Sequence, residues 1–264
     1  MDLGLSEKVA LVTGASAGIG YAVAQRLVWE GCKLIICGRN GDRLKQAEQS
    51  LAAKEGKILS ISADVQQAKD SQAVVESALK KFGKIDILVN NSVGAKFARD
   101  AVENISDADW QAVLEGKLMG YIRMTKLVLP TMKDQKWGRI VNIIGTSGKE
   151  PSGNLIRSGV SNAGLINFTK AVATQVAPYN VLVNCVNPGM IETPRHQEYL
   201  EIFAKAGNKT ETEIKEDLIK RIPQGRRGEA KEVANLVTFL ASECASYITG
   251  ISIAIDGGLS SSAF

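Results

Sequence analysis

The sequence predicts one α/β domain of 264 residues, built on a doubly wound parallel sheet of about seven strands with helices on both faces. Three observations favour this fold class. Short apolar runs rich in Val, Ile and Leu recur along the chain, stretches with helical periodicity separate most of them, and a glycine-rich turn follows the first run directly. Strands that alternate with helices in this way form parallel sheets, because each helix carries the chain back to the edge where the next strand begins.

Seven apolar runs have the length and the β-branched content of buried strands. Stretches such as AQRLVWE and KDSQAVVESALKKF, which lie between them, have the periodicity of crossover helices. The predicted strands are KVALVT from Lys8, KLIIC from Lys33, ILSIS from Ile58, IDILVN from Ile85, RIVNII from Arg139, VLVNCVN from Val181 and ISIAI from Ile251.

One segment interrupts this alternation inside the single domain, which is expected to cover residues 1–264. Residues 189–228 carry two short helical patterns, RHQEYLEIFAKAG and TETEIKEDLIKRI, and no predicted strand. An insertion of this kind is typical of a segment that closes over a bound substrate. We therefore expect residues 189–228 to form a substrate lid.

Charge and composition exclude several classes of function. Lys and Arg number 32 against 28 for Asp and Glu, a net charge of +4 without basic runs, which argues against nucleic acid and leaves room for phosphorylated small ligands. No apolar run approaches the length of about 18 residues that a bilayer span needs, and acidic residues precede the first apolar run. We expect a cytoplasmic protein that binds neither membrane nor nucleic acid.

The cysteines do not form a metal-binding or disulfide pattern. The four residues Cys32, Cys37, Cys185 and Cys244 include no CxxC pair, and the chain has one histidine. We expect no metal site, and we expect the four thiols to be buried.

The glycine-rich turn predicts a nucleotide site. TGASAGIG covers residues 13–20, between a predicted strand and a predicted helix. Glycines at these places turn the chain, let backbone approach a pyrophosphate and allow the helix to pack closely, whereas a turn without a ligand is the alternative. The predicted contacts in this turn are Gly14, Ser16, Gly18, Ile19 and Gly20.

The residues after the second predicted strand favour NADP(H) over NAD(H). This stretch reads Cys37, Gly38, Arg39 and Asn40, without the acidic residue that would bind a ribose 2′-hydroxyl. The Arg39 guanidinium instead suits a 2′-phosphate. The alternative is that Arg39 is a solvated loop cation.

From Ser6 to Gly258 the chain resembles the short-chain dehydrogenases/reductases. The resemblance rests on TGASAGIG, the Asp64-Val65 pair, VNN at 89–91, NPG at 187–189 with Thr193, and the ending ITGISIAIDGG. It implies a Rossmann-type fold, a nicotinamide cofactor and a tetramer built from long helix pairs and the last strand. The further cofactor contacts that it implies are Asp64, Val65, Asn91, Pro188, Gly189 and Thr193.

The four residues with which this family usually reduces carbonyls differ here. The resemblance places Lys117 at the Asn position, Gly145 at the Ser position, Ser158 at the Tyr position and Asn162 at the Lys position. If the alignment shifts by one or two residues, the hydroxyl at the Ser position would come from Thr146 or Ser147. A serine cannot replace a tyrosine as the acid, because its hydroxyl is far less acidic and its side chain is shorter by a whole ring. No catalytic residue is therefore predicted with certainty.

The cofactor side shows a further departure. The fourth strand of the family usually ends in NNAG, whereas this chain has NNSVG, with Val93 in place of the small residue that lies against the ribose. We expect NADP(H) to bind weakly on this side, or not at all.

Three functions fit these observations. The preferred hypothesis is a catalytically silent or supporting subunit that pairs with an active homologous chain, as a homo- or hetero-tetramer, in an alcohol or hydroxyacyl dehydrogenase (ketone or 3-oxoacyl reductase) acting on a small molecule or an acyl-CoA. The first alternative is an NADPH-dependent carbonyl reductase with Lys117 as relocated proton donor. The second is a non-redox lyase or ligand-binding regulator.

Overall fold

The computed structural model describes residues 2–51, 57–92, 101–207 and 210–262, and it contains one sheet of seven parallel strands. This confirms the predicted fold class, and each predicted apolar run supplies one strand. In sheet order the strands are β3 (Ile58–Ser62), β2 (Lys33–Gly38), β1 (Val9–Thr13), β4 (Ile87–Asn90), β5 (Gly138–Ile143), β6 (Val181–Pro188) and β9 (Ser252–Ile255).

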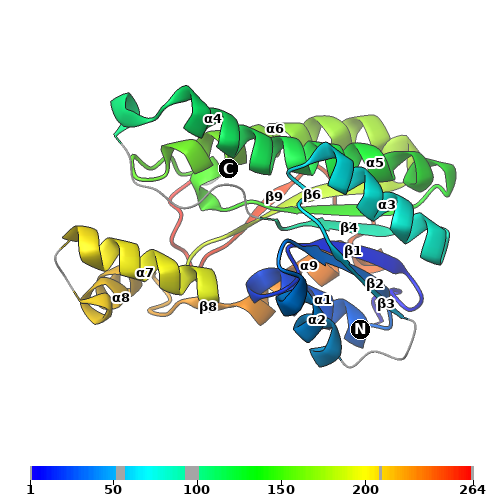
Figure 1. Cartoon of the computed structure of the whole chain (residues 1–264), viewed down its shortest axis with the longest axis horizontal. Coiled ribbons are helices and arrows are strands. Elements are labelled where there is room, and N and C mark those ends of the chain that lie inside the picture. The colour runs from blue at the N-terminus through cyan, green and yellow to red at the C-terminus, as the bar shows by residue number, and fades with distance from the viewer. Residues whose placement is uncertain (1, 52–56, 93–100, 208–209, 263–264) are drawn as a thin grey trace.

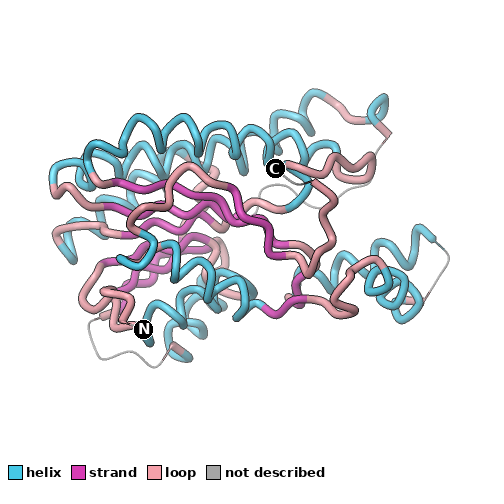
Figure 2. Tube along the Cα trace, turned by 180° about the vertical axis from the view of Figure 1, so that it is seen from behind, coloured by secondary structure: helices cyan, strands magenta, loops and turns pink. Residues whose placement is uncertain are grey.

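Helices cover both faces of the sheet, which lies as a middle layer between them (Figures 1 and 2). One face is packed by α1 (Gly18–Trp29), α2 (Gly41–Ser50) and α9 (Ala230–Leu240). The opposite face is packed by α3 (Ala68–Phe82), α5 (Gly120–Asp134) and α6 (Ile156–Val176). The shorter α4 (Asp107–Val113) runs into α5 through a π-helical segment, Leu114–Met119.

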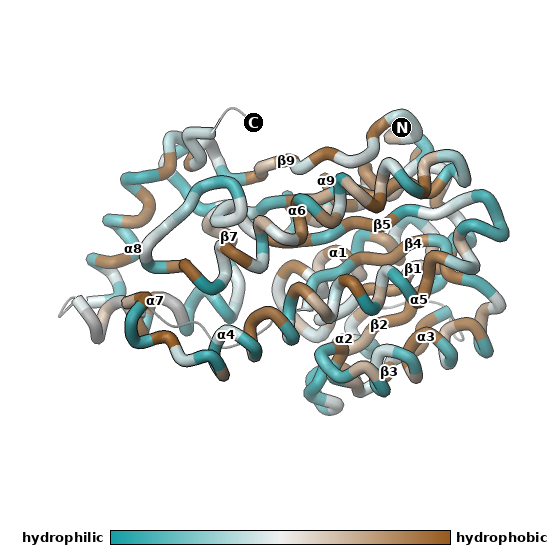
Figure 3. Tube along the Cα trace, turned by 90° about the horizontal axis from the view of Figure 1, so that it is seen from above, coloured by the Kyte–Doolittle hydropathy of each residue, from teal (hydrophilic) through white to brown (hydrophobic). Residues whose placement is uncertain are grey.

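Two large apolar cores hold these layers together, one on each face of the sheet, and a third, smaller cluster contains Tyr121, Ile144, Leu165 and Cys185. Alternate residues of β1 serve both large cores: Ala10 and Val12 pack toward α1, and Val9 and Leu11 pack toward α3 and α5. Polar residues lie on the outer turns of helices such as α2 and α3 (Figure 3). This double burial explains why the strands read as continuous apolar runs in the sequence.

The order of the strands determines where a ligand can bind. The chain builds outward from β1 to β3 on one side, then returns to place β4 on the other side of β1. Connections leaving β1 and β4 therefore diverge to opposite faces and leave a crevice at the carboxyl ends of the strands. The loops that follow β1, β2, β3 and β4 all reach this edge.

The insertion at residues 189–228 carries α7 (Pro194–Gly207) and α8 (Glu211–Lys220), which stand apart from the sheet at one end of the molecule (Figure 1). The expectation that this segment has no strand is wrong at its ends, where β7 (Ile191–Glu192) pairs with β8 (Gly228–Glu229). Gly228 packs closely against Ile191, whose Cδ1 would lie 2.7 Å from a Cβ at this position. The role of the insertion as a lid stays a prediction.

The thiols follow the prediction at three positions and depart from it at one. Cys32, Cys37 and Cys185 are buried, whereas Cys244 is exposed in a 3₁₀ turn after α9, where its Sγ donates to the Asp2 carbonyl at 3.3 Å. Among the helices that the structure describes, none is both long enough and apolar enough to cross a bilayer.

Candidate active site

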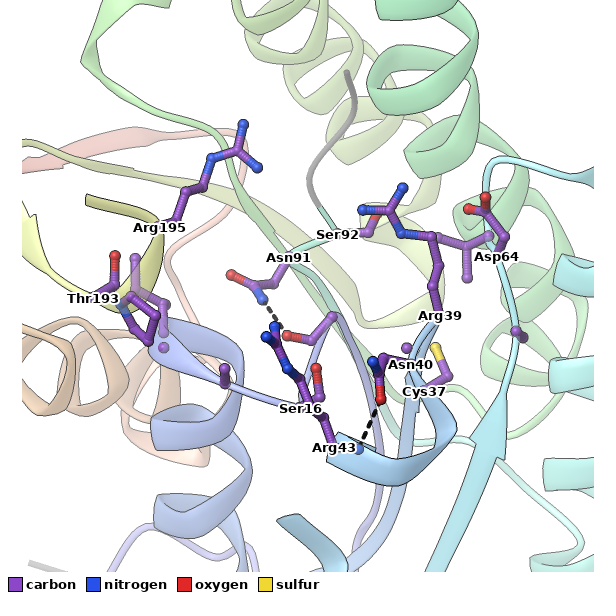
Figure 4. Close-up of a pocket in the computed structure, with 18 of the residues that line it drawn as sticks. Ser16, Cys37, Arg39, Asn40, Arg43, Asp64, Asn91, Ser92, Thr193 and Arg195 are labelled. Atoms are coloured by element: carbon purple, nitrogen blue, oxygen red, sulfur yellow. Dashed lines mark hydrogen bonds between the residues drawn. The ribbon is translucent and has the colours of Figure 1, made fainter. Parts of the chain in front are cut away.

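A pocket of about 350 Å³ lies at the carboxyl edge of the sheet, where the loops after β1, β2, β3 and β4 meet the start of α7 (Figure 4). Nine of the predicted cofactor contacts line it: Gly14, Ser16, Gly18, Ile19, Arg39, Asp64, Val65, Asn91 and Thr193. The structure thus brings together residues from five separate segments of the sequence. Gly20, Pro188 and Gly189 do not line this pocket, so their contact with a cofactor stays a prediction.

The glycine-rich turn is closely packed, and a larger residue in it would be strained. Gly14 and Gly18 have φ angles of +63° and +57°, and a Cβ at Gly20 would lie 2.3 Å from the Gly14 carbonyl oxygen. Helix α1 begins here without a side-chain cap, so the N–H groups of its first turn face the pocket side of the chain without a side-chain acceptor. Such a helix start favours an anionic ligand.

Asn91 fixes the position of this turn. Its Nδ2 donates to the carbonyl oxygens of Thr13 and Gly14 at 3.2 and 3.1 Å, and its backbone N–H donates to Thr13 Oγ1 at 2.9 Å. These bonds tie the end of β4 to the end of β1. Asn91 therefore fixes the shape of the turn and also lines the pocket itself.

The opposite end of the pocket carries two arginines. Arg39 follows β2, and Arg43 lies in the first turn of α2, which Asn40 caps by accepting the Arg43 N–H at 2.9 Å (Figure 4). Asp42 does not line the described pocket. Sequence reasoning missed Arg43, although its spacing of four residues from Arg39 across a helix start is a signal for one shared ligand.

The wall residues that were not predicted include three polar ones, Ser92, Arg195 and Glu198. Ser92 follows Asn91, and its buried Oγ has no hydrogen-bond partner among the described residues. Arg195 and Glu198 belong to α7 and bring charge into the pocket from the insertion. The nearby Val93, with its expected effect on the cofactor, lies outside the described residues.

Lys117 is held at the carboxyl end of β5. It lies in the π-helical segment before α5, and its Nζ donates to the Ile144 carbonyl oxygen at 2.8 Å. Burial, with a further contribution from the positive charge of Arg195, lowers the pKa of Lys117 from 10.5 to about 7. A π-helical turn at this place aims the lysine inward and is a feature often found at functional sites.

Gly145, Ser147 and Asn162 lie together after β5, and neither they nor Lys117 are among the residues that line the pocket. Asn162 Nδ2 donates to Ser147 Oγ at 2.9 Å, while the buried Asn162 Oδ1 has no partner among the described residues. Gly145 has a φ of +137°, and a Cβ there would lie 3.3 Å from Asn162 Nδ2. By contrast Ser158 is exposed, and Ser161 Oγ donates to its carbonyl oxygen at 3.1 Å.

Comparison with known proteins agrees with this architecture. A family model described as enoyl-(acyl carrier protein) reductase matches residues 14–260. The chain is 36% identical over 256 residues to the NADPH-dependent reductase BacG of Bacillus subtilis, covering 96% of this chain and 98% of that protein. It is 40% identical over 261 residues to the 3-oxoacyl-[acyl-carrier-protein] reductase FabG of Aquifex aeolicus, covering 98% and 100%. The chain belongs to the short-chain dehydrogenase/reductase family.

A solved structure of the family extends this likeness to three dimensions. The L-sorbose reductase of Gluconobacter frateurii, in complex with NADPH and L-sorbose, superimposes with a TM-score of 0.92 at 32% identity, covering 99% of this chain and 100% of that one. The resemblance stated from the motifs is therefore confirmed for the family and its fold. The loss of the four catalytic residues stays a prediction.

The backbone at Gly145 leads to a first prediction. Gly145→Ala should lower the free energy of unfolding by about 1–3 kcal/mol, because an L side chain is strained at this φ angle. Gly153→Ala is the matched control, because Gly153 has open space around its Cβ position and no positive φ. Urea unfolding of both variants measures the difference, and equal stability would contradict the strain.

The pKa of Lys117 leads to a second prediction. The pKa of Lys117 is 10.5 in the unfolded chain and about 7 in the folded chain. Folding is therefore destabilised by the full pKa difference below pH 7, by less of it as the pH rises, and not at all above pH 10.5. The stability of Lys117→Met relative to the wild type should therefore be greatest below pH 7 and fall as the pH rises toward 10.5. Urea unfolding between pH 6 and pH 10 tests this.

Lys126→Met is the control for the second prediction, because Lys126 is an exposed residue of α5. Its stability difference from the wild type should not change over the same pH range. A flat difference for Lys117→Met as well would show that Lys117 titrates near its ordinary pKa.

Proposed function

We propose that this chain is an NADPH-dependent carbonyl reductase in which Lys117 donates the proton. The observation that carries the proposal is the Lys117 ammonium, held by the Ile144 carbonyl at the carboxyl end of β5 with a pKa near 7. The relatives support the reductase, because BacG is named an NADPH-dependent reductase and FabG a 3-oxoacyl-[acyl-carrier-protein] reductase. They favour this alternative over the silent subunit that the sequence favours.

The residues present fit NADPH. Arg39 and Arg43 supply positive charge for a 2′-phosphate, and the glycine-rich turn with the start of α1 suits a pyrophosphate. Ser92 lines the pocket, and its buried Oγ lacks a partner among the described residues, as expected of a group that bonds to a ligand. When bound, NADPH would supply the hydride.

The chain's own residues then account for the proton. Hydride arrival at the carbonyl carbon leaves negative charge on the oxygen, and Lys117 Nζ transfers a proton there, becoming a neutral amine that solvent reprotonates. The Ile144 carbonyl orients the ammonium. Ser147 Oγ accepts a hydrogen bond from Asn162, so its own O–H is left to donate to the oxygen of the substrate carbonyl and polarise it.

A homologous chain as partner in a homo- or hetero-tetramer remains a proposal, as does an acyl-CoA or other small-molecule substrate. The silent-subunit hypothesis differs from the reductase in one measurable respect. It requires that turnover appear only when an active homologous chain is added. The non-redox lyase or regulator has no specific observation in its favour.

The proton donor leads to a third prediction. Lys117→Met should lower kcat for NADPH-dependent ketone reduction by about 10²–10⁴-fold, and Lys117→Arg should not restore it, because arginine keeps its proton. Wild-type kcat/KM for reduction should fall above about pH 7, as Lys117 loses its proton. Initial rates of NADPH oxidation across pH measure both effects.

Lys126→Met is again the control and should keep the wild-type rate and pH profile. Turnover that survives Lys117→Met with an unchanged profile would remove Lys117 as the donor. A wild-type chain without turnover that becomes active when a homologous chain is added would establish the silent subunit instead.

The adenosine end of the pocket leads to a fourth prediction. The double variant Arg39→Ala, Arg43→Ala should raise the Kd for NADPH about 10- to 100-fold and leave the Kd for NADH nearly unchanged, because each arginine serves only the 2′-phosphate. Lys45→Ala, an exposed cation of the same α2 helix, is the control. Calorimetric titration of both nucleotides decides, and tighter NADH binding by the wild type would contradict the cofactor choice.

A further inference from the structure

The turn that follows β3 forms part of the pocket wall. Asp64, Val65 and Gln66 all line the pocket, and Figure 4 draws Asp64 on the same side as Arg39. The Gln67 N–H donates to the Asp64 carbonyl oxygen at 2.8 Å, which closes residues 64–67 into one turn, called the β3 turn below. Because the 2′-phosphate is proposed to lie at Arg39, the adenosine of the cofactor would lie against the β3 turn.

Helix α3 holds the β3 turn from one side. Asp70 Oδ2 accepts the Asp64 N–H at 2.9 Å, and Ser71 Oγ donates to the Val65 carbonyl oxygen at 2.9 Å. Both partners come from the start of α3. The backbone of the turn at Asp64 and Val65 is therefore fixed by the helix that follows it directly in the sequence.

Helix α5 holds the β3 turn from the other side. Arg123 Nη1 donates to the Gln66 carbonyl oxygen at 2.8 Å, across 57 residues of sequence. One helical turn earlier α5 runs in contact with the β3 turn, because a Cβ at Gly120 would lie 3.4 Å from the Val65 carbonyl oxygen. Arg123 therefore fixes the third residue of the turn to a helix that lies after β4.

Glu115 fixes the direction of this guanidinium. Arg123 Nη2 pairs with Glu115 Oε1, eight residues earlier in the π-helical segment that precedes α5. The Glu115 side chain is 55% exposed and that of Arg123 is 20% exposed. An ion pair so open to solvent adds little stability by itself. Its effect is to hold Nη2 on one side, so that Nη1 points at Gln66.

We propose that Arg123 is a positioning residue for the nucleotide, which holds the β3 turn in the shape that binds the adenosine end of the cofactor. Arg123 is not among the residues that line the pocket, so it acts through the Gln66 carbonyl. A wall that is ordered before the ligand arrives saves the ligand the entropy of ordering it. This inference rests on the proposed function, because it takes the ligand to be an adenine dinucleotide.

The test measures the binding of adenosine 2′,5′-bisphosphate, the adenosine half of NADPH, by calorimetry. Arg123→Met should raise the Kd for this fragment and for NADPH by the same factor, about 5- to 20-fold, because the bond lost from the β3 turn is the same for both ligands. The kcat at saturating NADPH should stay at the wild-type value. Lys126→Met, at an exposed position of the same helix, is the control and should leave both Kd values unchanged.

A double variant tests the part assigned to Glu115. Glu115→Gln alone should raise the Kd for the fragment about 2- to 4-fold, and it should have no further effect in the Arg123→Met background, because Glu115 acts through Arg123. An equal effect in both backgrounds would overturn this part of the proposal.

Hydrogen exchange tests the positioning without any nucleotide. The amides of residues 64–67 should exchange faster in Arg123→Met than in the wild type and in Lys126→Met. Equal exchange in all three proteins would overturn the proposal, and so would a wild type that does not bind the fragment. A kcat at saturating NADPH that falls in Arg123→Met as much as the Kd rises would show a general structural role instead.

The binding measurement separates this inference from the proposed function, because it needs no turnover. Fragment binding that Arg123→Met weakens, in a protein that never reduces a ketone, supports the role of Arg123 and refutes the reductase. Ketone reduction by a protein whose Kd for the fragment is the same in Arg123→Met supports the reductase and refutes the role of Arg123.

Discussion

The close approach of the glycine-rich turn to the end of β4 is the constraint on which the site depends. A Cβ at Gly20 would lie 2.3 Å both from the Gly14 carbonyl and from Asn91 Nδ2, so only a glycine lets α1 begin at this depth. Asn91 then bonds the carbonyls of Thr13 and Gly14, which joins β1, α1 and β4 in one hydrogen-bonded unit. Because the connections that leave β1 and β4 diverge to opposite faces of the sheet here, this unit forms the floor of the crevice. The arginines and the residues of α7 are additions around it.

The residues around Lys117 depend on a different constraint, the backbone after β5. Gly145 adopts a φ of +137°, and Asn162 occupies the space beside it, bonded to Ser147. A larger residue at Gly145 would be strained at this φ, and its Cβ would lie 3.3 Å from Asn162 Nδ2, so Asn162 would have to shift. Lys117, by contrast, needs no change of backbone: the π-helical segment directs it at Ile144, and burial lowers its pKa toward neutrality. On the proposed function, the half-buried Lys117 is an acid of suitable pKa, whereas the exposed Ser158 is not.

Much of this could be read from the sequence because it depends on local pattern. The seven strands are buried on both faces and so appear as unbroken apolar runs. Glycine is favoured at 14 and 18 because φ is positive there, and at 20 because a Cβ would clash. What the sequence could not show depends on contacts distant in the chain. Arg195 lies more than a hundred residues from Arg39 yet shares its pocket, and β7 and β8 are two residues each, too short for any periodicity. Nothing in the sequence distinguishes Cys244 from the three buried cysteines, and its exposure follows from its place in the 3₁₀ turn after α9.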